Sequence, residues 1–346
     1  MGSSRKKATG RFAAITISLV SLIFSLAAAE LVMRAMGHTP LQPRTLTGDG
    51  SRTETPIMTE KHPSLGWVNK PGTYNYPGFS ADIESITVTV LPDRGRRTMA
   101  TDSPLPTTQD KLILVGGSYI QGYAISDQET LAWKLQRQFP DVSVRNLGVP
   151  GYGTFQSLLT LEDVLPDIDG GKTIFYGYIG HHQMRNVLHF GWLEMFTRVG
   201  EPSYFPPYAT IGEDGNLMRY PVSSSNNWPF RDSLALVNKA ERAWLRYLSQ
   251  SRADKHEAVT EKIVVEMQNL AESQGAKFVV LLLLDTDSYT PDFIRFLDAN
   301  DLDYLNCSPP VFGPEYRVVG EGHPNNELNS IWEQCITNYL QPGVTR

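Results

Sequence analysis

The chain has 346 residues, of which 41% are hydrophobic and 20% are charged, as in an ordinary globular protein. Its formal net charge of -6 argues against a nucleic-acid partner, because no basic face is implied. The two cysteines, Cys307 and Cys335, exclude a cysteine-based zinc site and a disulfide-dense scaffold. They leave open either one disulfide, if the compartment is oxidising, or a free buried thiol at Cys335 on the last helix.

The N-terminus has the pattern of a membrane anchor. Basic residues within positions 1–11 precede an uncharged run over 12–29, and these 18 residues come near the length that crosses a bilayer as a helix. A basic flank places the N-terminal side in the cytoplasm. We therefore predict a cytoplasmic tail over 1–11 and a single-pass helix over 12–36 in the cell inner membrane, with the rest of the chain periplasmic or extracellular.

A cleaved signal peptide is the competing interpretation, because residues 26–29 offer small side chains for cleavage. The helical pattern, however, continues through residues 31–33. Glu30 and Arg34 flank this continuation at the i,i+4 spacing of an ion pair, which favours an uncleaved anchor.

Two segments without helical pattern follow the anchor. Residues 37–60 are rich in Pro, Thr, Gly and Ser, which predicts a linker between the membrane and the domain. Residues 61–110 are predicted to form an extended segment that packs on the main fold. Within it, Leu65 and Trp67 stand among turn residues, and residues 86–91 alternate in the manner of a strand.

From Lys111 onward, strand and helix patterns alternate. Apolar runs predict five strands, at 112–115, 142–147, 173–179, 278–284 and 302–305. The last predicted helix carries Leu328, Trp332 and Ile336 on one face. The alternation predicts a three-layer α/β domain over 111–346 with a mostly parallel sheet. Residues 190–231 show little pattern and are predicted to be an insertion over the site.

Ligands bind at the carboxyl ends of the strands in such sheets, so site residues are expected in the loops after the first three strands. The first of these loops is Gly116-Gly117-Ser118. The glycines permit a sharp turn and a close approach of other groups. A serine on such a turn suits a nucleophile.

A nucleophilic serine needs a base, an acidic partner for that base and donors for an oxyanion. His323 titrates in the range that suits a base, and Glu321, two residues earlier, can orient its imidazole. Asp303 is the alternative acid. Backbone N–H groups of Ser118 and Gly151, together with a side chain from the third loop, are the predicted oxyanion donors.

The third loop contains several polar side chains. His182, Arg185 and Asn186 are predicted to contact substrate. The alternative for His182 is a structural role behind the site, and the alternative for Arg185 and Asn186 is bracing of the loop. The histidines at 181, 182 and 189 lack the i,i+4 spacing of a helical zinc pair, so no metal and no cofactor are expected. Aromatic residues of the insertion are predicted either to stack on sugar rings or to form a core under it: Trp192, Phe205, Tyr208 and Trp228.

These blocks, in this order over about residues 112 to 341, resemble the SGNH (GDSL-like) hydrolase family. Gly116-Gly117-Ser118 is similar to the family's Gly-Asp-Ser block, residues 146–151 resemble the second block, and residues 321–325 resemble the last. The third block departs, because Gly180-His181-His182 stands where the family has Gly-Asn-Asp. The resemblance implies that His181 takes the asparagine's place in the oxyanion hole. The acid departs too, since many members have Asp three residues before the histidine, where this chain has Gly320.

The resemblance implies a flavodoxin-like α/β/α sandwich and a serine esterase, with Ser118, His323 and Glu321 as catalytic residues and Ser118, Gly151 and His181 as the oxyanion hole. With the anchor, the expected substrate is an acyl ester outside the cytoplasm, such as an acetyl group on a polysaccharide. Two alternatives remain open at this point. One is an O-acyltransferase that uses the same residues, and the other is a catalytically inactive binding or assembly subunit.

Overall fold

The computed structural model describes residues 2–42, 56–80, 85–100, 110–198, 204–224 and 227–341. Its centre is a five-stranded sheet in the order β13-β12-β7-β5-β6. The strands are β5 (Asp110–Gly116), β6 (Ser143–Asn146), β7 (Gly171–Tyr178), β12 (Ala276–Leu282) and β13 (Tyr304–Asn306). All neighbouring pairs are parallel. Numbered along the chain, the order is 2-1-3-4-5, the flavodoxin-like arrangement, so the predicted fold class and five strands are confirmed.

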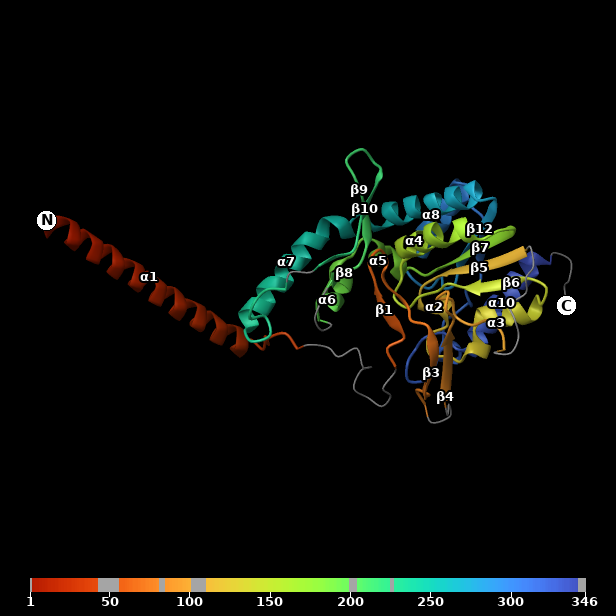
Figure 1. Cartoon of the computed structure of the whole chain (residues 1–346), viewed down its shortest axis with the longest axis horizontal. Helices are drawn as coiled ribbons and strands as arrows, with labels where there is room; N and C mark the ends of the chain where they lie inside the picture. The colour runs from red at the N-terminus through yellow and green to blue at the C-terminus, as the bar shows by residue number, and fades with distance from the viewer. Residues whose placement is uncertain are drawn as a thin grey trace.

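Helices cover both faces of this sheet (Figure 1). One face packs against α4 (Thr154–Val164), α8 (His256–Ser273) and α9 (Thr290–Ala299), and the other against α3 (Leu131–Gln138) and α10 (Asn326–Leu340). Alternate residues of β12 enter the two cores, with Phe278 and Val280 on one side and Val279 and Leu281 on the other. A central parallel strand buried on both faces explains why this run is apolar throughout.

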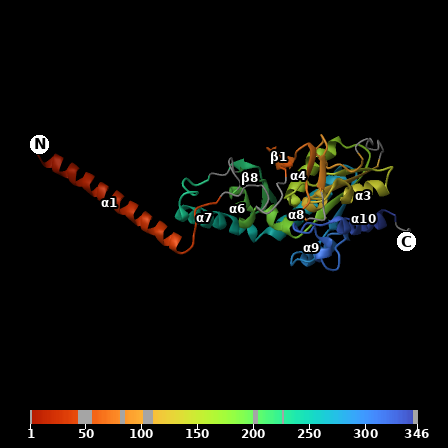
Figure 2. The same cartoon turned by 90° about the horizontal axis from the view of Figure 1, so that it is seen from below.

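Helix α1 (Gly2–Ala35) projects away from the domain (Figures 1 and 2). Residues Phe12–Ala35 are long and apolar enough to cross a membrane, a property that a signal sequence shares. The predicted pair forms, with Arg34 Nε 2.6 Å from Glu30 Oε1. Glu30 also accepts hydrogen bonds from the backbone N–H groups of Ala235 and Leu236. These residues begin α7 (Ala235–Ala253), so the end of α1 caps a helix of the domain.

The segment before the domain forms two antiparallel hairpins, one from β1 (Thr59–His62) and β2 (Gly66–Asn69) and one from β3 (Gly72–Pro77) and β4 (Ser85–Val90). Trp67 Nε1 donates to Pro150 O at 2.8 Å, and Asn69 Nδ2 donates to Gly148 O at 2.9 Å. The first hairpin therefore supports the loop that follows β6. Most of the predicted linker, residues 43–55, lies outside the described residues, as do 81–84, 101–109 and the side chains of the basic tail.

The predicted insertion has more structure than its sequence pattern suggested. It holds α6 (Phe190–Arg198), the strand pair β9 (Tyr208–Ile211) with β10 (Leu217–Tyr220), and the short pair β8 (Tyr204–Phe205) with β11 (Ser223–Ser224). Residues 199–203 and 225–226 lie outside the described part. Tyr208 stacks on Tyr220 at 4.6 Å between ring centroids, and Phe205 packs against a buried leucine cluster. Tyr208 and Phe205 therefore form a local core, whereas Trp228 is 38% exposed.

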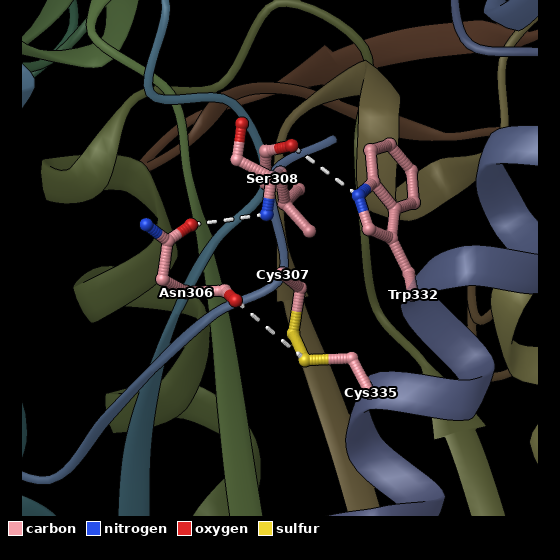
Figure 3. The surroundings of a disulfide bond; sticks show 6 residues. Asn306, Cys307, Ser308, Trp332 and Cys335 are labelled. Carbon is pink, nitrogen blue, oxygen red and sulfur yellow. Dashed lines mark hydrogen bonds between the residues drawn. A yellow bond between two sulfur atoms is a disulfide. The ribbon is translucent and has the colours of Figure 1, made fainter. Parts of the chain in front are cut away.

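The disulfide that the sequence left open is present, between Cys307 and Cys335 (Figure 3). Cys307 directly follows β13, and Cys335 lies on α10. One turn earlier on α10, Trp332 donates from Nε1 to Leu283 O at 3.2 Å, at the carboxyl end of β12. The disulfide and Trp332 together hold α10 against the sheet edge where the site residues are expected.

A buried arginine that the sequence pattern did not single out organises the loop after Ser118. Arg96 is 1% exposed and pairs through Nε with Asp127 Oδ1 at 3.0 Å. Its two terminal nitrogens donate to the backbone oxygens of Gln121, Gly122 and Ile125. One side chain from the pre-domain segment therefore fixes the chain from α2 (Ser118–Gln121) to residue 127.

We expect Arg96→Ala to lower the free energy of unfolding by about 3–5 kcal/mol, because it leaves Asp127 and three carbonyl groups without their partner in the interior. Chemical denaturation followed by circular dichroism measures the change. The matched control is Arg145→Ala, which removes a surface ion pair with Asp93 at 2.8 Å and is expected to cost about 1 kcal/mol or less. Equal losses in the two variants would contradict the bracing role of Arg96.

Candidate active site

The turn after β5 requires both of its glycines. Gly116 has φ +155°, and a Cβ there would lie 2.8 Å from Ile120 Cγ1 and 3.0 Å from Gly177 O. A Cβ on Gly117 would lie 3.0 Å from His182 Nε2 and 3.1 Å from Tyr152 O. The missing side chains therefore let the second and third loops close against the residue that precedes Ser118.

The structure brings Ser118, His323 and Glu321 into one chain of hydrogen bonds. His323 Nε2 lies 3.0 Å from Ser118 Oγ, and His323 Nδ1 lies 2.7 Å from Glu321 Oε1. The other carboxylate oxygen accepts from the His323 backbone N–H at 2.8 Å. The carboxylate fixes the proton on Nδ1 and leaves Nε2 free to accept the serine proton. Asp303 instead pairs with Lys277 at 3.2 Å, before the start of β13, at the opposite end of the sheet.

Two tyrosines that the sequence analysis missed pack against the imidazole of His323. The ring of Tyr123 lies 4.9 Å from it and that of Tyr119 lies 5.6 Å from it. Tyr119 also stacks on Trp332 of α10, so the tryptophan that seats α10 also supports the wall of the site. Tyr119 directly follows Ser118 in the sequence, and Tyr123 comes four residues later. This nearness to the serine is the signal that could have identified them.

The predicted oxyanion donors change in one respect. The backbone N–H groups of Ser118 and Gly151 form no hydrogen bond within the described residues. His181, predicted as the third donor, has an exposed side chain at the start of α5 (His181–Asn186). The buried neighbour, His182, points its Nε2 at Gly117 and has no partner for that atom in the described part of the chain. His182 is therefore a candidate for the third donor in place of His181.

A chain of buried hydrogen bonds connects His182 to Tyr176, Thr154 and Asn186. Asn186 Oδ1 accepts from the Phe155 backbone N–H, so its Nδ2 must donate, and it does so to Thr154 Oγ1 at 2.9 Å and to Thr260 Oγ1 at 2.8 Å. Thr154 Oγ1 lies 2.8 Å from the Tyr176 hydroxyl. Thr154 accepts from Asn186 through one lone pair, so toward Tyr176 its hydroxyl can either accept or donate.

The Tyr176 hydroxyl in turn lies 2.8 Å from His182 Nδ1. When Thr154 donates to Tyr176, the tyrosine proton goes to Nδ1 and the imidazole proton sits on Nε2; when Tyr176 donates to Thr154, the imidazole proton sits on Nδ1. In the first arrangement His182 presents an N–H beside Gly117. Asn186 belongs to this chain and not to the substrate surface, since it is 1% exposed and all its polar atoms have protein partners. Its predicted substrate contact is wrong.

Arg185 lies beside the same glycine. Its Nη1 would be 3.6 Å from a Cβ on Gly117 and donates to Tyr152 O at 3.0 Å. Its guanidinium carbon sits 4.7 Å from the ring centre of Trp192, and that ring and Trp67 flank Gly151. Burial lowers the pKa of Arg185 to about 10, so the side chain remains charged at neutral pH.

The chain is similar to several solved structures. No protein-family model and no curated protein matches the chain. Similar solved structures include a member of the lipolytic protein G-D-S-L family from Veillonella parvula, with 11% identity, a TM-score of 0.39, and coverage of 66% of this chain and 96% of that one. TesA is 12% identical, with a TM-score of 0.40 and coverage of 67% of this chain and 99% of that one. The psychrotrophic esterase EstA from Pseudoalteromonas sp. is 9% identical, with a TM-score of 0.39 and coverage of 67% of this chain and 98% of that one. The strand order of the central sheet shows the flavodoxin-like fold of this chain.

The environment of His182 predicts a pH effect on stability. Burial, reinforced by Arg185, lowers the pKa of His182 well below its usual value. The unfolded chain binds a proton there below about pH 6.5 and the folded chain does not, so the free energy of unfolding falls as the pH drops below that value, by up to about 1.4 kcal/mol per pH unit. Urea unfolding from about pH 6.5 to about pH 5 should show a shallower dependence for His182→Gln. Identical slopes would contradict a neutral His182.

Proposed function

We propose that this chain is an extracytoplasmic serine esterase of the SGNH type, anchored by α1. The observation that carries the proposal is the hydrogen-bonded series from Ser118 through His323 to Glu321, with distances of 3.0 and 2.7 Å. Such a series is what an acyl-transfer nucleophile requires. The disulfide between Cys307 and Cys335 supports a domain outside the cytoplasm.

In the proposed reaction, Ser118 Oγ attacks the ester carbonyl while His323 Nε2 takes its proton. The oxyanion receives hydrogen bonds from the backbone N–H groups of Ser118 and Gly151 and from His182 Nε2. His323 then protonates the departing alcohol, and the acyl-serine remains. Water, deprotonated by the same imidazole, releases the acid and restores Ser118. Glu321 holds the imidazolium in place throughout.

The proposed substrates are small O-acyl esters, with acetylated carbohydrate as the class that suits an enzyme facing the cell envelope. Transfer of the acyl group to a sugar hydroxyl uses the same first half-reaction. Product analysis with and without an acceptor glycan separates the two outcomes, because a transferase forms acylated acceptor at the expense of free acid. The intact hydrogen-bonded series argues against an inactive binding subunit.

Labelling with a p-nitrophenyl phosphonate should modify Ser118 in the wild type and nothing in Ser118→Ala, because only a serine with an adjacent base attacks phosphorus at a useful rate. Mass spectrometry of the modified peptide locates the label. Ser233, an exposed serine away from the site, supplies the control variant Ser233→Ala, which should label fully. Absence of label in the folded wild type, or equal label in Ser118→Ala, would reject the proposal.

The candidate oxyanion donor His182 gives a separate expectation. His182→Leu should lower kcat on p-nitrophenyl acetate about 10²- to 10³-fold, because one donor to the oxyanion is lost. His182→Gln places a side-chain N–H near the position of Nε2 and should recover part of the loss. The matched control is His181→Leu at the exposed neighbour, which should stay near the wild-type rate. A larger loss in His181→Leu than in His182→Leu would return the role to His181.

A further inference from the structure

Arg185 is a cation beside the nucleophile whose hydrogen-bonding capacity is only partly used. Within the described residues, its one hydrogen bond runs from Nη1 to Tyr152 O. The Nε and Nη2 groups have no partner there, and the side chain is only half-buried, so ligands can reach it. Trp192 stacks on the guanidinium plane, which holds the plane in place and leaves its edge open.

Arg252 shows what a fully satisfied arginine of the same type looks like in this chain. It also stacks on an aromatic ring, that of Tyr208 at 4.8 Å, and burial also lowers its pKa. Its Nε, Nη1 and Nη2 groups all donate, to the backbone oxygens of Val187, Leu248 and Leu188. The open edge of Arg185 is therefore a property of its place and not of stacked arginines in general.

No carboxylate of the described residues forms an ion pair with Arg185. The nearby negative charge is that of Glu321, and both of its carboxylate oxygens are hydrogen-bonded to His323.

We propose that the Nε–Nη2 edge of Arg185 binds a carboxylate of the substrate, so that the preferred esters are those of acidic molecules with the carboxylate a few bonds from the acyl group. The edge presents two parallel N–H groups, the geometry that carboxylates accept in a bidentate manner. Because Nη1 lies against Gly117, the bound carboxylate comes close to the carbonyl that Ser118 attacks. This inference rests on the proposed esterase function for its substrate class, but the anion site itself does not.

Binding is tested first without catalysis. Full-length Ser118→Ala in detergent micelles is titrated by calorimetry with 3-acetoxybenzoate and with its neutral isostere 3-acetoxybenzamide. We expect the acid to bind about 10- to 100-fold more tightly, as for a hydrogen-bonded charge pair. Adding Arg185→Gln should abolish the preference, whereas adding Arg252→Gln, the matched stacked arginine, should leave it unchanged. Equal binding of the two ligands by Ser118→Ala overturns the proposal.

Turnover is tested second, as the ratio of kcat/KM for the acid to that for the amide. Arg185→Gln should lower this ratio about 10- to 100-fold, and Arg185→Lys, which keeps the charge without the fork, should lower it less. Equal losses on both esters would show a general structural effect and reject the carboxylate site. If the wild type hydrolyses neither ester while Ser118→Ala keeps an Arg185-dependent preference, the esterase function fails and the anion site stands.

Discussion

The site depends on one steric constraint, the close approach of three loops at Gly117. Any Cβ at this position would press on His182 Nε2 and Tyr152 O, 3.0 and 3.1 Å away. The parallel sheet makes the approach possible, because the carboxyl ends of β6, β5 and β7 are neighbours. The fourth contribution, His323, arrives from the loop before α10, whose position is fixed by Trp332 and by the disulfide. A side chain at Gly117 would therefore affect all the groups at once.

Much of this arrangement was predictable from local patterns. The five strands and the last helix follow from apolar runs and helical spacing, because burial on both faces demands them. The positions of Ser118 and His323 follow from the rule that loops at one sheet edge meet. Their hydrogen bond was predictable as a pairing of chemical roles, since a serine without a base has no nucleophilic use at neutral pH. The Glu30–Arg34 pair followed from helical spacing alone.

What could not be predicted depends on orientation or on contacts between distant segments. Neighbouring residues at a helix start point about 100° apart, so a shift of one position decides between His181 and His182, and no local pattern reveals it. Arg96 reaches Asp127 across 31 positions, from a segment whose sequence resembles that of a loop. The sequence left the disulfide open because pairing needs a Cα separation, here 5.7 Å, that only the fold provides.

His182 and Arg185, the two side chains beside Gly117, differ in charge. An unmade hydrogen bond in a protein interior costs about 1–3 kcal/mol, so the unpartnered Nε2 of His182 reduces the stability of the chain. Burial keeps His182 neutral, which suits a donor to a charge that exists only in the transition state. Arg185 remains charged, which suits a charge that the substrate carries permanently. A neutral donor and a permanent cation beside one glycine can therefore take separate roles, one in catalysis and one in the selection of substrate.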